Sequence, residues 1–202
     1  MESKNSALVM IMIIVSFAGF WIENIFTAYK KGIMTNRNMI LPFLLGYGLS
    51  ILGFYFAFGT PDMPMFFGNA LLFSSPFAAF LYYFSVSFLF VCMGEMILGS
   101  LTEHLCGIIW WNYTDIPLHI SKYTSVPTSI AFASIITLFM KFLFNPLINI
   151  FSASDIRLLS LLSVAIISFL SFDFIHSGIY MFRNRKLLDI WSIKFKKQRR
   201  QE

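Results

Sequence analysis

Carboxylates inside apolar sequence are the residues of this chain best suited to do chemistry. Glu23, Glu95 and Glu103 lie in or at the ends of long hydrophobic runs. A charged side chain at the centre of a membrane-spanning helix costs about 2.5–3.5 kcal/mol on insertion scales, so such residues are candidates for a functional site. A carboxylate in that setting can bind a cation, exchange a proton or act as a general acid or base.

Glu95 and Glu103 are eight positions apart in one apolar run. On a helix, eight steps of about 100° leave the two side chains roughly 80° apart and about 12 Å different in depth. That separation is too large for one shared proton. The spacing therefore predicts two carboxylates at different depths of one polar cleft.

Polar loops accompany these carboxylates, and their basic residues are potential partners. Arg37 or Lys122 can neutralise a carboxylate and donate hydrogen bonds to it. The tryptophan pair at 110 and 111 is typical of a membrane interface. The predicted cleft residues are Glu23, Asn36, Arg37, Glu95, Glu103, Trp110, Trp111, Asn112 and Lys122. Two interpretations stay open, a ligand-binding cleft and ion pairs that only lock the fold.

A second polar pair, Asp173 and His176, lies three residues apart and is expected on one helix face. An aspartate that orients a histidine serves acid–base chemistry, but it also serves as a polar contact between packed helices. We favour the packing contact because no serine or cysteine nucleophile motif is nearby. Lys141 is expected to pair with Asp173 or to extend its charged end outward.

Positioning these residues requires a membrane architecture. Of the 202 residues, 57% are hydrophobic and 12% charged, with a mean hydropathy of +0.73, which is far from a soluble composition. We predict an all-α, polytopic bundle of about five transmembrane spans, since about 20 residues cross a bilayer. The expected spans are 7–28, 39–59, 77–101, 126–150 and 158–182. Six spans would require the region 61–76 to be divided differently.

Basic residues predict the orientation, because cytoplasmic loops carry the excess of Lys and Arg. The first loop holds Lys30, Lys31 and Arg37, and residues 183–202 hold eight basic residues against Asp189 and Glu202. Both segments are expected in the cytoplasm, with the N-terminus outside. We divide the chain into a transmembrane domain, 1–182, and a basic tail, 183–202. The tail is expected to be a short interfacial helix attracted to anionic lipid headgroups, or a plain topology signal.

Several function classes find no support in the sequence. It contains no phosphate-binding loop, HExxH, GxSxG or Cys/His cluster, so we expect no cofactor or metal and have no catalytic motif to assign. Nucleic acid is not expected as a partner, and no internal repeat is evident. Energised transport by this chain would require a separate ATPase chain or an ion gradient.

Two motifs carry a family resemblance. The first comprises Trp21, Glu23, Asn36, Arg37, Pro42, Tyr47 and Gly48, and the second comprises Glu95, Glu103, Trp110, Trp111, Asn112, Tyr113 and Pro117. Together they resemble the putative ABC-transporter permease family, type IV, of small bacterial integral membrane proteins. Asn112 stands where that family usually has Asp, and Asn38 where it usually has Gly. The stretch 119–123 replaces a usual Asn-x-Asn-Gly-Arg.

The resemblance implies a multi-pass protein of the bacterial inner membrane with a role in transport. Its expected partners are the lipid bilayer and a separate ATPase subunit or another membrane chain. The leading hypothesis is a permease-like membrane component whose carboxylate-lined cleft lies near the cytoplasmic side. The alternatives are an integral-membrane enzyme acting on a lipid or headgroup, and a non-catalytic membrane partner or regulator.

Overall fold

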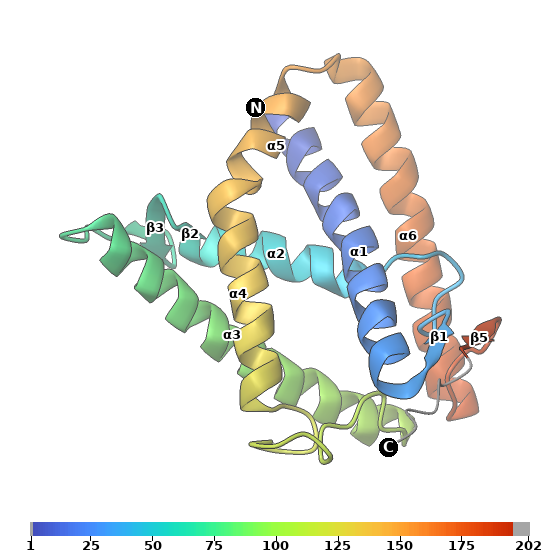
Figure 1. Ribbon diagram of the computed structural model, residues 1–202. Coiled ribbons are helices and arrows are strands. Elements are labelled where there is room, and N and C mark those ends of the chain that lie inside the picture. Colours follow the sequence, from blue (N-terminus) through green and yellow to red (C-terminus); the bar gives the residue numbers. More distant parts are fainter. Residues whose placement is uncertain (1, 196–202) are drawn as a thin grey trace. The chain divides into compact units, whose positions relative to one another are not determined.

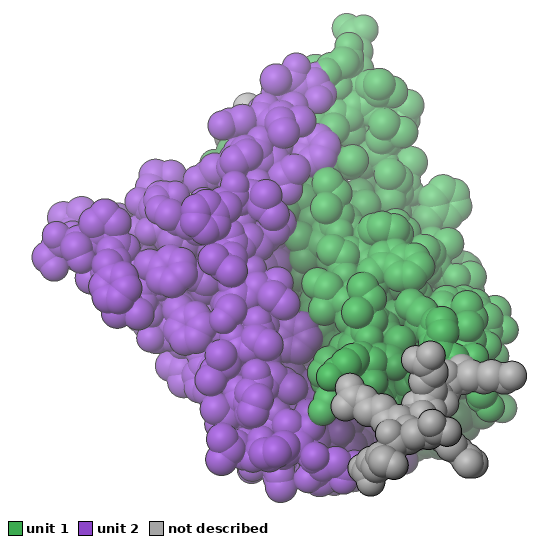
Figure 2. Space-filling model, viewed as in Figure 1, with its two compact units in different colours: residues 1–50, 155–202 green, residues 51–154 purple. Residues whose placement is uncertain are grey.

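The computed structural model describes residues 2–195, which divide into two compact units. Unit 1 combines the two ends of the sequence, residues 1–50 and 155–202, and unit 2 is the continuous segment 51–154 (Figure 2). Each unit is described by itself. The candidate site residues are distributed over both.

Two long helices form the body of unit 1, α1 (Glu2–Lys31) and α6 (Ile156–Asn184), and they pack along each other (Figure 1). The Asp155 carboxylate begins α6 by accepting hydrogen bonds from the backbone N–H groups of Arg157 and Leu158. After α1 comes β1 (Ile33–Thr35), which pairs antiparallel with β5 (Ser192–Lys194). Helix α2 (Leu45–Phe58) begins in this unit. The strand pair joins the loop after α1 to the chain after α6.

Unit 2 contains the rest of α2 and the helices α3 (Pro76–Cys106), α4 (Val126–Phe142) and α5 (Phe144–Ser152). Helices α3 and α4 pack against each other, and each begins with a capping serine, Ser75 or Ser125, whose side chain accepts a backbone N–H. Between α2 and α3, the short strands β2 (Gly59–Thr60), β3 (Met63–Phe66) and β4 (Asn69–Ala70) form a three-stranded antiparallel sheet.

The predicted helical membrane architecture is confirmed, with three helices long and apolar enough to cross a bilayer: 3–31 of α1, α3 and α6. Helices α4 and α5, bent by 44° at their junction, make a fourth when they count as one span. The 14 residues of α2 rise about 21 Å, which is less than the roughly 30 Å of a bilayer core. The five-span count needs α2 to cross as well, and stays a prediction. The three-stranded sheet of β2, β3 and β4, called the hairpin region from here on, occupies the segment that a sixth span would have needed.

The predicted interfacial helix in the tail is wrong for the part that the structure describes. Helix α6 ends at Asn184, and residues 185–195 form bends, irregular backbone and strand β5 with no further helix. Two asparagines of the first loop explain the difference, because their side chains bind the tail backbone at Leu188 and Ile190. The last residues of the predicted tail, 196–202, lie outside the described residues.

Candidate functional site

An ion pair covered by a tyrosine lies in unit 1, near the end of α1 that is predicted to face the cytoplasm. Arg37 Nη2 donates to Glu23 Oε2 over 2.7 Å, and the Tyr47 hydroxyl donates to the other oxygen, Oε1. Thr27, one turn further along α1, accepts from Arg37 Nη1 over 3.5 Å. The side chains of Glu23 and Arg37 are both only 17% exposed. Glu23 is thus held by a cation and a phenol in a largely enclosed place.

The loop that presents Arg37 is shaped by buried asparagines. Asn36 Nδ2 donates to the carbonyl oxygens of Met39 and Leu188, each over 2.9 Å, and Asn38 Oδ1 accepts from Leu188 N over 2.6 Å. Arg37 and Asn38 have left-handed φ values of 51° and 64°. Asparagine tolerates this conformation better than most residues, which suits Asn38 to a position where the related family usually has glycine. Asn36 is therefore a structural residue of the loop.

Asp173 of α6 completes the same loop. Its carboxylate accepts from the backbone N–H groups of Ile40 and Leu41, over 2.9 and 2.8 Å, and from the Ser177 hydroxyl over 3.1 Å. His176 instead is exposed, and its ring stacks on Phe172. Within residues 2–195 no hydrogen bond joins Asp173 to His176, so the expected polar pair is wrong. Asp173 is buried, and its carboxylate supplies the acceptors that these two loop amides need.

Lys141 also differs from its expected pairing. Its ammonium forms an ion pair with Asp62, which lies in the turn between β2 and β3 of the same unit. Asp173 belongs to unit 1. The pairing with Asp173 is therefore wrong, because the ammonium of Lys141 is paired with Asp62 instead.

A second tyrosine-covered ion pair lies in unit 2, near the end of α3. Lys122 Nζ is 2.7 and 2.8 Å from the two oxygens of Glu103, and the Tyr123 hydroxyl donates to Oε2 over 2.5 Å. The ammonium also lies 5.1 Å from the centroid of the Tyr123 ring, within range of a cation–π interaction. The hydrogen bond to Glu103 raises the pKa of Lys122 above its ordinary value, so the lysine stays charged.

Glu95 faces two hydroxyls of the same unit. The Tyr113 hydroxyl donates to Oε1 over 3.3 Å, and Ser129 Oγ of α4 donates to Oε2 over 3.5 Å. Ser129 is fully buried. Two turns apart on α3, Glu95 and Glu103 both point to residues of the segment 107–129. These two contacts of Glu95 are with neutral hydroxyls, whereas Glu103 contacts the charged Lys122.

The predicted residues of the third loop divide into two groups. Trp111 Nε1 donates to the Tyr123 carbonyl over 2.8 Å and so holds the tyrosine that covers Glu103. Trp110 contacts Trp111 through its ring. Asn112 is exposed, and its side chain accepts a hydrogen bond from Thr114 N in a local turn.

Hydroxyl side chains are the part of the site that we did not predict. Thr27, Tyr47, Tyr113, Tyr123 and Ser129 all contact one of the three glutamates or its cation. Tyr47 and Tyr113 belong to the two motifs, which is a signal for them. The remaining three have no sequence signal, since tyrosine, serine and threonine are common near membrane interfaces.

The nine residues predicted to surround one cleft lie in different units. Glu23, Asn36 and Arg37 belong to unit 1, and Glu95, Glu103 and Lys122 belong to unit 2. A cleft shared by all of them remains a prediction. Among residues 2–195, no group of three or more His, Cys, Asp or Glu side chains is placed to hold a metal ion.

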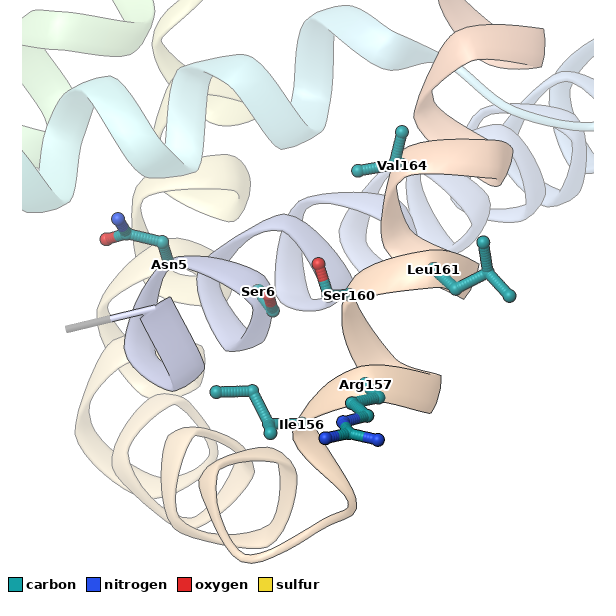
Figure 3. A pocket seen from close by; sticks show the side chains of 7 residues that line it. All are labelled: Asn5, Ser6, Ile156, Arg157, Ser160, Leu161 and Val164. Atoms are coloured by element: carbon teal, nitrogen blue, oxygen red, sulfur yellow. The ribbon is translucent and has the colours of Figure 1, made fainter.

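Two cavities lie in unit 1, and neither is lined by Glu23 or Arg37. One, of about 670 Å³, opens between the first turns of α1 and α6 and is lined by Ser6, Arg157, Ser160 and Val164, among others (Figure 3). The other, of about 160 Å³, lies beside Asn36 and Trp191. Neither is lined by a carboxylate, so neither adds an acid or base to the site.

Apolar helices of membrane-spanning length that carry carboxylates define an integral membrane protein. A model of the family described as "Putative ABC-transporter type IV" matches residues 10–178, and the chain belongs to that family. The expected resemblance is thereby confirmed, and both motifs fall inside the matched range. No curated protein and no solved structure matches the chain.

Proposed function

We propose that this protein is the permease-like membrane component of a transport system in the bacterial cell membrane. Family membership and the apolar helices support the transport association. The observation that carries the proposal is the pairing of carboxylates at the ends of spanning helices with loop cations, Glu23 with Arg37 and Glu103 with Lys122. Such polar groups are retained in membrane helices chiefly along substrate or ion pathways.

The strand pair supports the predicted orientation. Because β1 binds β5, the loop after α1 and the chain after α6 lie on one side of the membrane, and both helices run toward that side. The segment between them must then cross an odd number of times. Helix α3 alone makes three crossings in total, whereas α2, α3 and the α4–α5 pair make five. The basic residues of both joined segments favour the cytoplasm for this side, which leaves the N-terminus outside.

An energy source must come from elsewhere, since the chain has no phosphate-binding loop. A separate ATPase subunit or another membrane chain is the expected partner. The loop 107–125 is a candidate for the contact in the five-crossing arrangement, where it faces the cytoplasm with Glu103 and Lys122 at its base.

Purification and a variant series test this function. The full chain, extracted in a mild detergent, is expected to co-purify with an ATPase whose hydrolysis rate changes when the chain is present. In cells, Glu23→Gln, Glu95→Gln and Glu103→Gln are expected to alter the same compounds in an untargeted comparison of cell and medium extracts. Asp62→Asn is the matched control, because Asp62 lies in an exposed ion pair in the hairpin region. Folded variants that leave every extract unchanged, together with no ATPase partner, would contradict the proposal.

A further inference from the structure

The site in unit 1 depends on a glycine one turn before its glutamate. A β-carbon placed on Gly19 would lie 2.5 Å from Cγ of Tyr47, closer than atoms can approach. The Tyr47 ring therefore rests directly on the α1 backbone, and its hydroxyl reaches Glu23, four residues further along the helix. Glycine is what lets the ring approach this closely.

Unit 2 repeats this arrangement with different residues. A β-carbon on Gly99 would lie 2.5 Å from Cδ1 of Tyr123. The Tyr123 ring rests on the α3 backbone, and its hydroxyl reaches Glu103, again four residues after the glycine. In both units the tyrosine is at or just before the start of the next helix, α2 or α4.

The order along the chain is also the same in the two units. Each has Gly-x3-Glu near the end of a long apolar helix, then a basic loop residue that binds the glutamate, then the tyrosine that covers it. This set of residues is called the Gly-Glu-Tyr module below: Gly19, Glu23, Arg37 and Tyr47 in unit 1, and Gly99, Glu103, Lys122 and Tyr123 in unit 2. Its few shared positions, at unequal loop lengths, explain why no repeat is evident in the sequence.

The two copies differ in how tightly the cation is held. Arg37 and Glu23 are 17% exposed, and Arg37 has a second partner in Thr27. Lys122 is 39% exposed and Glu103 32%. Exposed ion pairs contribute little to stability, and a lysine at the end of a flexible stem is easily moved. The copy in unit 1 is therefore the more enclosed of the two, and the copy in unit 2 is the more accessible.

We propose that the Gly-Glu-Tyr module of unit 2 is a binding site for a primary ammonium group, which Lys122 occupies in this structure. This inference rests on the proposed transport function and names a ligand class for its site. A carboxylate, a phenol oxygen and an aromatic face are the groups that bind an ammonium ion, and Lys122 already makes two of these contacts. An incoming ammonium replaces the lysine without changing the net charge of the site.

The tyrosine wall remains when the lysine leaves. Tyr123 is held by its contact with Gly99, and its carbonyl accepts the hydrogen bond from Trp111, neither of which involves Lys122. The ammonium group can belong to either of two sources, an ethanolamine lipid headgroup or a soluble amine. The tryptophan pair beside the site is typical of the headgroup region, so both sources have access to it.

The test uses the full chain with Lys122→Ala in nanodiscs of phosphatidylcholine, and the midpoint of thermal unfolding as the measurement. We expect ethylammonium chloride to raise this midpoint, while tetramethylammonium, which has no N–H group, does not. In the double variant Lys122→Ala with Glu103→Gln, the ethylammonium concentration that gives the same rise in the midpoint should be about tenfold higher or more. A second arm replaces part of the phosphatidylcholine with phosphatidylethanolamine and tests the lipid source.

Lys141→Ala is the matched control, since Lys141 also pairs with a carboxylate in unit 2 but has no such module. Lys122→Gln takes the place of Lys122→Ala if the latter does not fold. A response no larger than that of Lys141→Ala, or one that Glu103→Gln leaves intact, overturns the proposal. These results are independent of ATPase co-purification, so a failure here is distinguishable from a failure of the transport function.

Discussion

The ring of Tyr123 lies against the backbone of Gly99, one helical turn before the carboxylate that its hydroxyl binds. Gly99→Ala places a β-carbon only 2.5 Å from the tyrosine ring, so the ring must move and its hydroxyl must lose the contact with Glu103. We expect a loss of about 1–3 kcal/mol in the free energy of unfolding, as for other overpacked contacts. Denaturation of the purified protein in detergent measures it.

Gly94→Ala is the control for that experiment. Gly94 lies in the same helix with nothing within 4 Å of the new β-carbon, and alanine is the better helix former. This variant should be as stable as the parent protein or slightly more stable. Equal stability of the two variants would mean that the contact between Tyr123 and Gly99 is unimportant.

The start of α2 approaches α1 at Gly48. A β-carbon there would lie 2.2 Å from the Met12 carbonyl oxygen and 2.4 Å from Ser16 Oγ. Gly48→Ala should therefore separate the two helices and lower the yield of folded protein, because a backbone oxygen cannot yield as a side chain can. Gly46→Ala, in the same helix with open space around it, should fold normally. The comparison is made by size-exclusion chromatography in detergent, and equal monodisperse yields contradict it.

The ion pair of Arg37 and Glu23 should be energetically coupled. Arg37→Met leaves a largely enclosed carboxylate without its cation, and we expect a loss of about 1–3 kcal/mol. The double variant Glu23→Gln with Arg37→Met should recover part of this loss, since no unpaired charge remains. A double-mutant cycle measures the coupling. The exposed pair of Asp62 and Lys141 supplies the comparison, and equal coupling in the two pairs would argue against enclosure as the cause.

Asp173 should be needed to hold the loop at residues 36–42. Asp173→Ala removes the acceptor of two backbone N–H groups, so we expect a loss of about 1–3 kcal/mol and faster hydrogen exchange at Ile40 and Leu41. His176→Ala should change stability by less than about 0.5 kcal/mol, because this side chain is exposed. Slow exchange at both amides in Asp173→Ala would contradict the capping role.

Cysteine labelling distinguishes five crossings from three. In a background with Cys92→Ala and Cys106→Ala, we expect Leu72→Cys to react with a membrane-impermeant reagent from outside the cell, and Leu118→Cys only from the cytoplasm. Both positions are strongly exposed loop residues. If the chain crosses only three times, with α2 and the α4–α5 pair not spanning, Leu72→Cys should react only from the cytoplasm and Leu118→Cys from outside. Tyr29→Cys, in the last turn of α1, should be cytoplasmic in either case.

The apolar runs alone were sufficient for the main helices. The predicted spans 77–101 and 158–182 correspond to α3 and α6, because a helix in an apolar environment satisfies its backbone internally and needs only length and composition. The prediction for 39–59 was too long, since α2 begins only at Leu45. Residues 36–42 are instead occupied by contacts with α6 and the tail, which lie more than 130 residues away in sequence.

Composition and charge also sufficed to identify a membrane protein and to single out its glutamates, since the cost of charge in an apolar helix is a local property. The residues that contact these polar groups could not be predicted in the same way. That Arg37 meets Glu23, that Asp173 binds two loop amides, and that a tyrosine rests on a glycine in each unit are contacts between distant segments. Helical periodicity places a side chain on a face, but only the packing of one helix against another determines what that face meets.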